Sequence, residues 1–402
     1  MDNSAALTEV LNSFLWNRSI SDDCFDAIMI DPGKFFEFAG IHNVRGIAAY
    51  KIYEYASLCP EDEGLSAIAK VAEVYYNKTV DESDERAEQY RKLAELFCDN
   101  NIDFIPLKGI LVREYYTVPQ LRSFSDIDII IRESDRQKCQ KVMLDNGFEE
   151  EIYYRTVWNY KRNNEYYEIH TEIIPDDIKE CLVWQSYFKA MWDNAELYLK
   201  NEYRLKKEFH FVFLIAHIAK HMYCRGAGIR MYLDLAFIFK NTDCSIKWDV
   251  VLKELKKLKL DKFFYVVANS VKAWFGISLP FKTPNVETGV LDSFYEFTMK
   301  AGVFGKEGVS SEMAIMKQVE KENSRAIKIK SIAQILFPPK AQLESKYTYI
   351  KDKPYLIPAA WIHRIISNIR KVREKTSEIK DVVSMNDEDI RELNVLYKNI
   401  GL

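Results

Sequence analysis

The segment that most restricts the fold of this chain is SFSDIDIIIRE, in which two aspartates lead into a run of isoleucines. β-Branched residues favour strands, and a short apolar run of this kind is typical of a strand buried in a sheet. Because side chains alternate along a strand, Asp126 and Asp128 share one face, whereas Ile127 and Ile129 point into the core. The segment therefore predicts a buried strand that carries two carboxylates on one side.

Two carboxylates about 4 Å apart repel each other by roughly 4 kcal/mol at an effective dielectric of about 20, so a fold that aims both at one point needs a cation there. Magnesium prefers carboxylate oxygens and keeps waters that phosphates can replace. Asp126 and Asp128 are thus the predicted ligands of a catalytic Mg²⁺ (or Mn²⁺). An isolated Asp-x-Asp pair is common and often merely solvated, but its place at the start of an apolar strand favours the catalytic interpretation.

A strand, a turn and a helix are predicted just before this strand. The apolar run Ile102–Leu107 is followed by Lys108 and Gly109, and helical spacing resumes over 110–116. A glycine lets the backbone approach a phosphate, and the N-terminus of a helix favours an anion. Lys108 and Gly109 are therefore predicted to hold phosphate.

Helices and strands alternate around this region, which predicts an α+β chain. Around the two strands already named, the expected elements are helices over 83–97 and 134–146, the second ending at Gly147, and strands over 148–160 and 166–174 joined at Asn163 and Asn164. Further helices are expected within the first eighty residues and over 208–223, 229–240, 247–274, 286–336 and 359–375. The expected units are an N-terminal helical region (1–82), a catalytic core (83–205) and a C-terminal helical domain (206–402).

Composition narrows the functional classes. With 402 residues, 48% of them hydrophobic and 29% charged, the chain is expected to fold into more than one packed unit. A net charge of −4 lacks the excess of positive charge that is typical of nucleic-acid-binding proteins, so no DNA partner is expected. The basic run over 253–262 leaves tRNA as a possible partner. Seven cysteines without a CxxC pair argue against structural zinc. No signal peptide or apolar span of about 18 residues is visible, which predicts a cytoplasmic protein without a membrane segment.

The stretch PLKGILVREYYTVPQLRSFSDIDIII resembles the signature of the nucleotidyltransferase superfamily with the DNA polymerase β-like fold. That signature has a hydrophobic residue, Gly-Ser or Gly-Gly, a helical spacer, and Asp-hydrophobic-Asp/Glu-hydrophobic; here Leu107, Gly109 and residues 126–129 match it. More closely, the stretch is similar to a bacterial nucleotidyltransferase family with Leu-Lys-Gly, then Tyr, Arg and Asp-Ile-Asp. The resemblance is sharp over 105–131 and loose over 40–360. Ile110 departs from it, because Ser or Gly is usual there, and the spacer is longer than usual.

The resemblance implies a polymerase β-like core, a mixed sheet with flanking helices. It also implies transfer of a nucleoside monophosphate from a nucleoside triphosphate to an acceptor hydroxyl or phosphate, with release of pyrophosphate. The superfamily takes a third carboxylate from a later strand, and Glu168 is the best match, with Glu165 and Glu172 as alternatives. The acceptor is a small molecule or a macromolecule that the sequence does not identify.

Other polar residues have more than one interpretation. Arg122 and Ser125 flank the aspartates and are predicted to bind nucleotide, but Arg122 could instead pair with an aspartate, and Ser125 could cap the strand. His217 and His221 share a helix face without an evident third metal ligand, which favours a core or supporting role. Arg230 and Asp234 are also four apart and are expected to pair.

Two other functions were compatible with these motifs. A toxin-like nucleotidyltransferase would use the same chemistry on tRNA, and a localised basic stripe would favour it. A catalytically silent nucleotide-binding module would keep the fold, but retention of Asp126, Asp128 and Glu168 argues against it.

Overall fold

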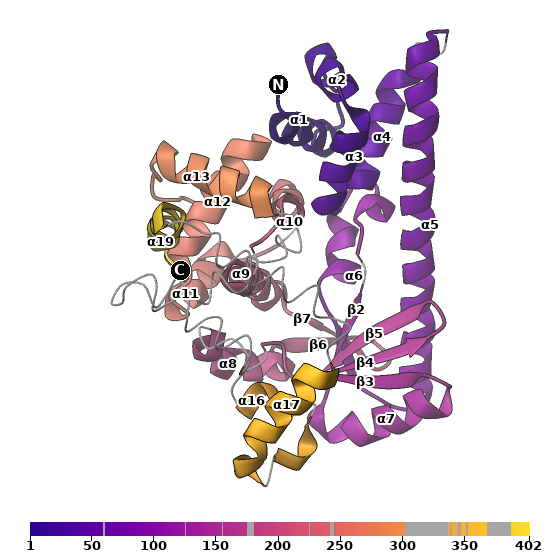
Figure 1. The fold of residues 1–402 in the computed structure, drawn as a ribbon, viewed down its shortest axis with the longest axis vertical. Coiled ribbons are helices and arrows are strands. Elements are labelled where there is room, and N and C mark those ends of the chain that lie inside the picture. The colour runs from indigo at the N-terminus through magenta and orange to yellow at the C-terminus, as the bar shows by residue number, and fades with distance from the viewer. Residues whose placement is uncertain are drawn as a thin grey trace.

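The computed structural model describes residues 1–58, 61–124, 126–154, 156–174, 181–224, 226–241, 245–301, 337, 340–343, 347–350, 353–367 and 387–402. These residues form a mixed α+β fold, as expected, in which helices surround a seven-stranded mixed sheet (Figure 1). None of the helices in the described ranges has the length and apolar character needed to cross a membrane.

The N-terminal part consists of helices, all of which except α4 begin with a side-chain cap. They are α1 (Asn3–Leu15), α2 (Asp22–Met29), α3 (Pro32–Ile41), α4 (Arg45–Ala56) and the long α5 (Glu63–Asp99). The sequence predicted a new helix beginning near Ser83, but α5 is continuous from its N-cap Asp62, and Ser83 is buried within it. No proline or glycine lies between residues 76 and 84, so nothing there interrupts the helix. The expected boundary after residue 82 falls inside α5, and the division into three units stays a prediction.

The sheet places the aspartate-bearing strand near its centre. Its strands are β1 (Phe104–Pro106), β2 (Ile127–Ile131), β3 (Glu149–Tyr154), β4 (Val157–Arg162), β5 (Glu165–His170), β6 (Ala195–Leu199) and β7 (Glu202–Leu205). Their order is β3-β4-β5-β2-β1-β7-β6, and β2 pairs antiparallel with β1 and parallel with β5. The predicted strand over 148–160 is therefore two strands, and β6 and β7 were not predicted. The side chains of β6 are mostly exposed and lack the alternation that identifies a strand.

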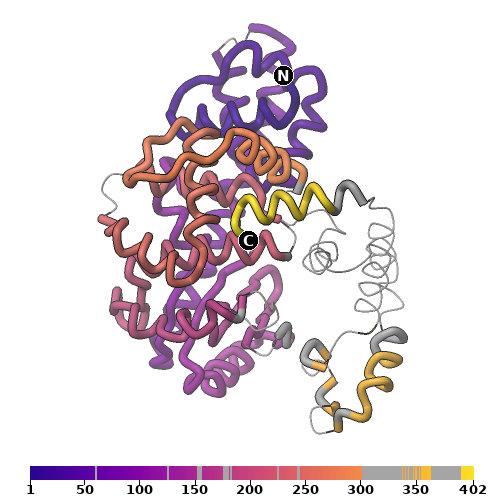
Figure 2. Tube along the Cα trace, turned by 90° about the vertical axis from the view of Figure 1, so that its left-hand side faces the viewer, coloured from indigo at the N-terminus to yellow at the C-terminus, as the bar shows by residue number. Residues whose placement is uncertain are grey.

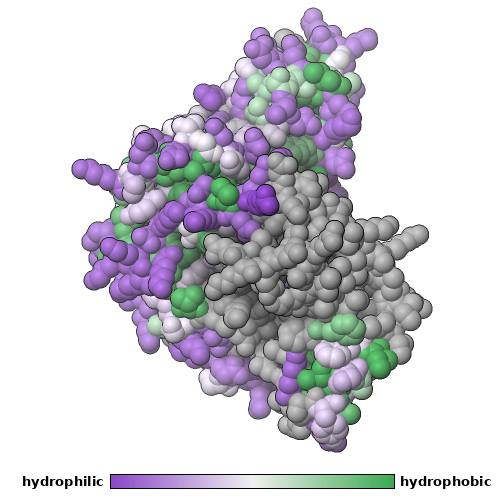
Figure 3. All heavy atoms as spheres, turned by 60° about the vertical axis from the view of Figure 1, so that its left-hand side comes forward, coloured by the Kyte–Doolittle hydropathy of each residue, from purple (hydrophilic) through white to green (hydrophobic). Residues whose placement is uncertain are grey.

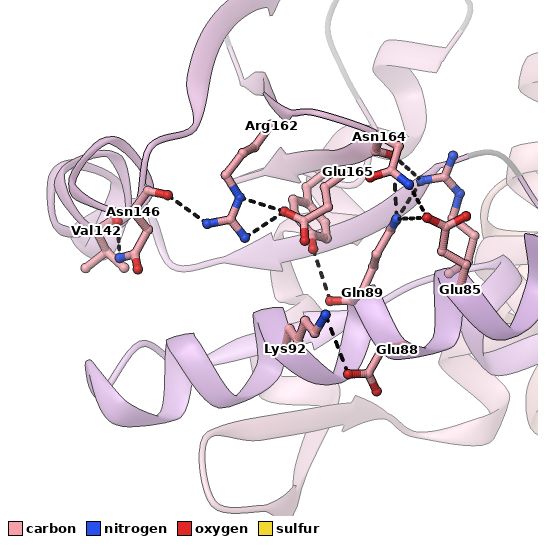
Figure 4. A network of polar contacts seen from close by, with 11 residues as sticks. Glu85, Glu88, Gln89, Lys92, Val142, Asn146, Arg162, Asn164 and Glu165 are labelled. Atoms are coloured by element: carbon pink, nitrogen blue, oxygen red, sulfur yellow. Dashed lines mark hydrogen bonds and ion pairs between the residues drawn. The ribbon is translucent and has the colours of Figure 1, made fainter.

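The hairpin between β4 and β5 rests on helix α5. Asn163 adopts φ 56°, which suits the predicted turn. The Asn164 carbonyl accepts hydrogen bonds from Arg86 (3.3 Å) and Gln89 (3.5 Å) of α5, and the Tyr167 hydroxyl donates to the Gln89 carbonyl at 3.1 Å (Figure 4). These contacts fix β5, and with it the side chains that β5 presents beside β2.

The short helices around the sheet agree only in part with those predicted from the sequence. The helix predicted over 110–116 is the four-residue α6 (Gly109–Val112) followed by a 3₁₀ turn (Arg113–Tyr115), and a second 3₁₀ turn covers Pro119–Leu121. Helix α7 (Arg136–Asp145) follows a 3₁₀ turn over Glu133–Asp135, and Gly147 has the left-handed φ of 79° expected after the end of a helix.

Helices make up most of the C-terminal part. They are α8 (Leu182–Phe188), a 3₁₀ helix (Lys189–Asn194), α9 (Lys207–Cys224), α10 (Ile229–Lys240), α11 (Trp248–Lys257), α12 (Asp261–Phe275), α13 (Thr288–Ala301), α16 (Lys340–Leu343), α17 (Ile357–Ser367) and α19 (Asp387–Ile400), with 3₁₀ turns over Thr348–Ile350 and Pro354–Leu356. The single helix predicted over 247–274 is divided at Lys259, which has φ 57°. The other two expected helices, over 286–336 and 359–375, continue beyond α13 and α17 into residues 302–336 and 368–375, which lie outside the described residues. Helix α19 lies against α13 and α12 (Figure 2).

Two hydrophobic cores meet at strand β2. One core joins α1–α4 to α9–α13 and contains Ile130; the other joins the sheet to α5 and α7 and contains Ile127, Ile129 and Ile131. Because Asp128 shares its strand face with Ile130, its side chain lies on the side of the C-terminal helices. On the face shown in Figure 3, hydrophilic side chains predominate over the described surface, with hydrophobic ones in small groups.

Candidate active site

Two neighbouring parallel strands bring Asp128 and Glu168 together. In the register of β2 and β5, Asp128 lies opposite Glu168, and Ile130 lies opposite His170. Side chains in register on adjacent strands point to the same face, so the carboxylates lie side by side. Asp128 is only 3% exposed, which makes its charge costly without partners.

The closest group of possible metal ligands is Asp128, Glu168 and His170. The His170 Nε2 lies 3.1 Å from Asp128 Oδ1 and 3.5 Å from Glu168 Oε2. One ligand atom from each of the three residues lies within 4.8 Å of the others. Ligand atoms about 2.1 Å from one cation in octahedral geometry are about 3 Å apart. This group can therefore hold a divalent cation.

Lys108 is part of the same cluster. Its Nζ lies 2.6 Å from Asp128 Oδ1, and the Leu107 N–H donates to the Asp128 carbonyl at 3.0 Å. Burial lowers the pKa of Lys108, but the carboxylates of Asp128, Asp126 and Glu168 outweigh burial and raise it. Lys108 was predicted to contact phosphate; in this structure its ammonium forms an ion pair with Asp128.

The charges around Asp128 keep it ionised. Burial acts to raise the pKa of this carboxyl, yet Lys108 and His170 together hold it well below its usual range. Burial likewise acts to lower the pKa of His170, while hydrogen bonds to Asp128 and Glu168 raise it. The carboxylates, imidazole and ammonium thus balance one another locally.

Asp126 lies just before β2 and is partly exposed. It lines the same cavity as Asp128 and Glu168. The sequence placed Asp126 and Asp128 together as the first metal ligands, whereas the closest ligand group in the described residues has His170 in the place of Asp126. Because Asp126 precedes the strand, strand alternation does not strictly govern its direction.

The cavity has a volume of about 280 Å³ and lies between the sheet and two C-terminal helices. The sheet side presents the carboxylates and Lys108, and the helical side presents cations, imidazoles and aliphatic groups. Its lining consists of Lys108, Gly109, Arg122, Phe124, Asp126, Asp128 and Glu168, and, from α9 and α10, Leu214, His217, Ile218, Lys220, His221, Arg230, Met231, Asp234 and Leu235. A strongly charged site is thus closed on one side by helices distant in the sequence.

Gly109 is required here by packing. A Cβ at this position would lie 2.6 Å from Arg122 Nη1 and 2.8 Å from the Phe124 Cβ. Helix α6, which begins at Gly109, has only four residues, so its dipole adds little to anion binding. The predicted phosphate contact of Gly109 stays a prediction, and the close approach that the structure shows is that of Arg122 and Phe124.

Arg122 forms a buried ion pair with Asp234 of α10. Its Nε lies 3.1 Å from Oδ1 and its Nη2 lies 2.6 Å from Oδ2, while the Tyr116 hydroxyl donates to Oδ1 at 2.7 Å. The sequence had suggested phosphate, Asp126 or Asp128 as partners of Arg122, and Arg230 as the partner of Asp234. The structure instead pairs Arg122 with Asp234, a contact across 112 positions that strand and helix periodicity do not reveal. Ser125 lies outside the described residues.

His217 and His221 face the cavity as a hydrogen-bonded pair. Their Nε2 atoms are 3.1 Å apart. Burial and the nearby cations lower the pKa of His221 to about 3 and that of His217 well below its usual value. No third metal-ligating side chain joins them among the residues that the structure describes. Both histidines are therefore uncharged at neutral pH.

The alternatives to Glu168 lie elsewhere. Glu165 accepts hydrogen bonds from Arg162, with an Nε–Oε2 distance of 2.8 Å, and Glu172 accepts one from Gln185 at 3.1 Å. Neither lines the cavity. Sequence reasoning did not assign Lys220 or Arg230 to the site. Both lie on helices that the sequence predicted, Lys220 on α9 and Arg230 on α10, but the position of these helices over the sheet was not visible.

Comparison with known proteins agrees with this chemistry. A family model described as an uncharacterised nucleotidyltransferase matches residues 29–276, more than half of the chain, including every residue that lines the cavity. No curated protein and no solved structure matches the chain. The match supports nucleotidyl transfer as the class of reaction and a nucleoside triphosphate as substrate. The expected relationship is confirmed at this level: the chain belongs to the uncharacterised nucleotidyltransferase family.

Proposed function

We propose that this protein is a metal-dependent enzyme that transfers a nucleoside monophosphate from a nucleoside triphosphate to an acceptor hydroxyl or phosphate, with release of pyrophosphate. The observation that carries the proposal is the convergence of Asp126, Asp128 and Glu168 on one cavity that also contains Lys108. Carboxylates gathered around one cavity in this way suit a cation-bound phosphate ligand.

We also propose that the core is polymerase β-like and that helical regions over 1–82 and 206–402 flank a catalytic unit over 83–205. The central place of β2, its parallel pairing with β5 and the turn between β1 and α6 support this assignment. The cavity between the sheet and helices α9 and α10 supports a role for the C-terminal region in enclosing the nucleotide.

The donor atoms of the cluster fit a divalent cation. Asp128 and Glu168 supply the oxygens that Mg²⁺ and Mn²⁺ prefer, and His170 adds a nitrogen 3.1 Å from Asp128 Oδ1. When bound, such an ion would neutralise charge on the phosphates of the substrate. Lys108 holds the Asp128 carboxylate in position, and the Tyr166 hydroxyl donates to Glu168 at 3.2 Å. Asp126 lies along the same wall and would complete the ligand set.

Glu168 has a second use in this proposal. Its side chain is 22% exposed, whereas that of Asp128 is 3% exposed, so Glu168 is the more accessible of the two to an incoming acceptor. A carboxylate within hydrogen-bond distance of an acceptor hydroxyl can take up its proton as the new bond to phosphorus forms. Glu168 is thus proposed as a metal ligand or as this general base.

The test compares Asp128→Asn and Glu168→Gln with Glu165→Gln and Glu172→Gln. Transfer from nucleoside triphosphates labelled at the α-phosphate, measured in the presence of Mg²⁺ or Mn²⁺, should fall by about a hundredfold or more in the first two variants. It should persist in the two control variants, whose carboxylates lie outside the cavity.

The acceptor need not be known for a second readout. Nucleotide with Mg²⁺ should raise the melting temperature of the wild type and fail to do so in a variant that combines Asp126→Asn with Asp128→Asn. An unchanged melting shift in that variant would count against a metal site at these carboxylates. Metal-dependent binding without any transfer would favour a silent nucleotide-binding module.

A further inference from the structure

We propose that Arg230 and Lys220, on the helical wall of the cavity, bind the triphosphate tail of the nucleotide. The inference rests on the proposed function and adds to it the residues that recognise the tail. It also reassigns the role first given to Lys108, whose ammonium is already paired with Asp128 at 2.6 Å. The ligand class is a polyphosphate that carries its own divalent cation.

Arg230 is a partly buried guanidinium that forms no ion pair with the described carboxylates. One of its terminal nitrogens donates to the Ser123 carbonyl, but its Nε is buried and has no hydrogen-bond partner. Among the described residues no carboxylate lies within ion-pair distance of it, because Asp234 is bonded to Arg122 and Tyr116. A buried donor without a hydrogen-bond partner, such as this Nε, is unfavourable unless a ligand accepts from it. Guanidinium groups suit phosphate oxygens because their donors match two oxygens at once.

Lys220 supplies a second cation on the same wall. It lies beside His221 on α9 and lines the cavity, and within the described part of the chain it forms no ion pair. Arg230 comes from the start of α10, so each of two helices contributes one cation that forms no ion pair in the described part of the chain. An anion that bridges both would satisfy charges that the protein itself leaves open.

The titration of neighbouring groups agrees with an excess of positive charge at this wall. Burial and the adjacent Arg122 lower the pKa of Arg230 to about 10. Burial, and then Lys220, Lys108 and Arg230, lower the pKa of His221, while Asp128 acts weakly in the opposite direction. Cations that depress the pKa of a nearby imidazole also attract an anion.

The two walls carry opposite charges, and this fits a metal polyphosphate better than a simple anion. Asp126, Asp128 and Glu168 on the sheet side would repel a bare triphosphate, but they can bind the metal that accompanies it. Arg230 and Lys220 then face the phosphate oxygens that the metal does not neutralise. The site should therefore prefer triphosphates over monophosphates, because the tail spans both walls.

Inorganic tripolyphosphate with Mg²⁺ is the probe, and its affinity is measured by calorimetry for the full chain. Arg230→Gln should weaken binding by about tenfold or more, since hydrogen bonds to charged groups are worth about 1.5–3 kcal/mol. Lys220→Gln should weaken it as well. Arg18→Gln removes an exposed arginine that does not line the cavity and should leave the affinity unchanged. Arg230→Lys keeps the charge and should fall between the wild type and Arg230→Gln.

The outcomes separate this inference from the proposed function. If Arg230→Gln binds tripolyphosphate as tightly as the wild type, the inference is wrong, even if Asp128→Asn still abolishes transfer. If the wild type binds nucleoside triphosphate but not tripolyphosphate, recognition lies in the base and the inference is also wrong. If Arg230 variants lose binding but no transfer is found with the wild type, the tail site stands and the enzymatic proposal fails. Arg230→Lys provides a test that does not depend on whether the glutamine variant folds. If this variant no longer prefers triphosphate over monophosphate, the inference is supported.

Discussion

Arg122 and Asp234 form a buried, two-bond ion pair that joins the loop before strand β2 to helix α10, with nitrogen–oxygen distances of 3.1 and 2.6 Å. The loop leads directly to Asp126 and Asp128, and α10 carries Arg230. This pair therefore connects the carboxylate side of the cavity to its cationic side. Because Asp234 binds Arg122, it does not form an ion pair with Arg230, four residues before it.

Asp234→Asn tests the strength of that connection. The substitution keeps the shape of the side chain but leaves the Arg122 guanidinium, 6% exposed, without its charge partner. We expect the free energy of unfolding to fall by about 3–5 kcal/mol, as for other broken buried pairs. Urea denaturation gives the value. Glu88→Gln, which breaks an exposed pair with Arg91, should cost far less, because solvent screens exposed charges; similar losses in both variants would contradict a special role for Asp234.

Lys108 has an unfavourable backbone conformation, with φ 53° and ψ −118°. A residue with a Cβ is strained there, whereas glycine is not. Lys108→Gly should therefore be more stable than Lys108→Ala by about 1–2 kcal/mol, although both lose the ion pair with Asp128. The same two substitutions at Lys141, exposed in the middle of α7, should give the opposite order, with alanine favoured by about 1 kcal/mol. The same order at both positions would mean that the strain at Lys108 is absent.

Gly109 should not tolerate a methyl group. In Gly109→Ala the new Cβ would meet Arg122 Nη1 at 2.6 Å and Phe124 Cβ at 2.8 Å, so the loop before β2 would have to shift. We expect a loss of about 1–3 kcal/mol in stability, measured by urea denaturation, together with a weaker melting shift from nucleotide. Gly289→Ala is the matched control, because nothing lies within 4 Å of its added Cβ. Equal effects at both positions would refute the packing argument.

Acid should destabilise the protein through histidines that are buried in the neutral form. Burial lowers the pKa of His42 and of His210 to about 4 and that of His221 to about 3. An unfolded chain has histidines with a pKa near 6.5, so between about pH 6.5 and 4 it binds more protons than the folded protein, and stability falls as the pH falls.

Each such histidine should contribute up to about 1.4 kcal/mol per pH unit. Urea denaturation between pH 7.5 and 4.5 should show that the stability of His210→Asn falls less steeply with pH than that of the wild type. The difference in slope should equal the contribution of one histidine. Above pH 7 the two should run parallel. Identical slopes in the acid range would show that His210 titrates alike in the folded and unfolded chain.

Local sequence pattern predicted the part of the site that strands create. Alternation and the isoleucine run located β2 with Asp128, and the resemblance to the superfamily selected Glu168, which lies opposite Asp128 on β5. The hairpin turn at Asn163 followed from its residue type. These features depend on near neighbours in the chain, which is why periodicity was sufficient.

The helical wall could not be predicted in this way. Helix α10 was located residue for residue, yet its place over the sheet depends on the core that joins α1–α4 to α9–α13. Arg122 and Asp234 meet across 112 positions, so the i, i+4 spacing of Arg230 and Asp234 suggested the wrong pair. Strands β6 and β7 were missed because pairing between strands stabilises them: β7 pairs with β1, and β6, whose side chains are mostly exposed, pairs with β7.

The most direct test of the metal-dependent site is a crystal of the protein with Mn²⁺ and a non-hydrolysable nucleoside triphosphate, measured at a wavelength where manganese scatters anomalously. The proposed site predicts an anomalous peak bonded to the carboxylates of Asp128 and Glu168, with the α-phosphate beside it and the remaining phosphates against Arg230 and Lys220. A nucleotide bound elsewhere, or bound in the cavity with no metal at these carboxylates, would contradict it.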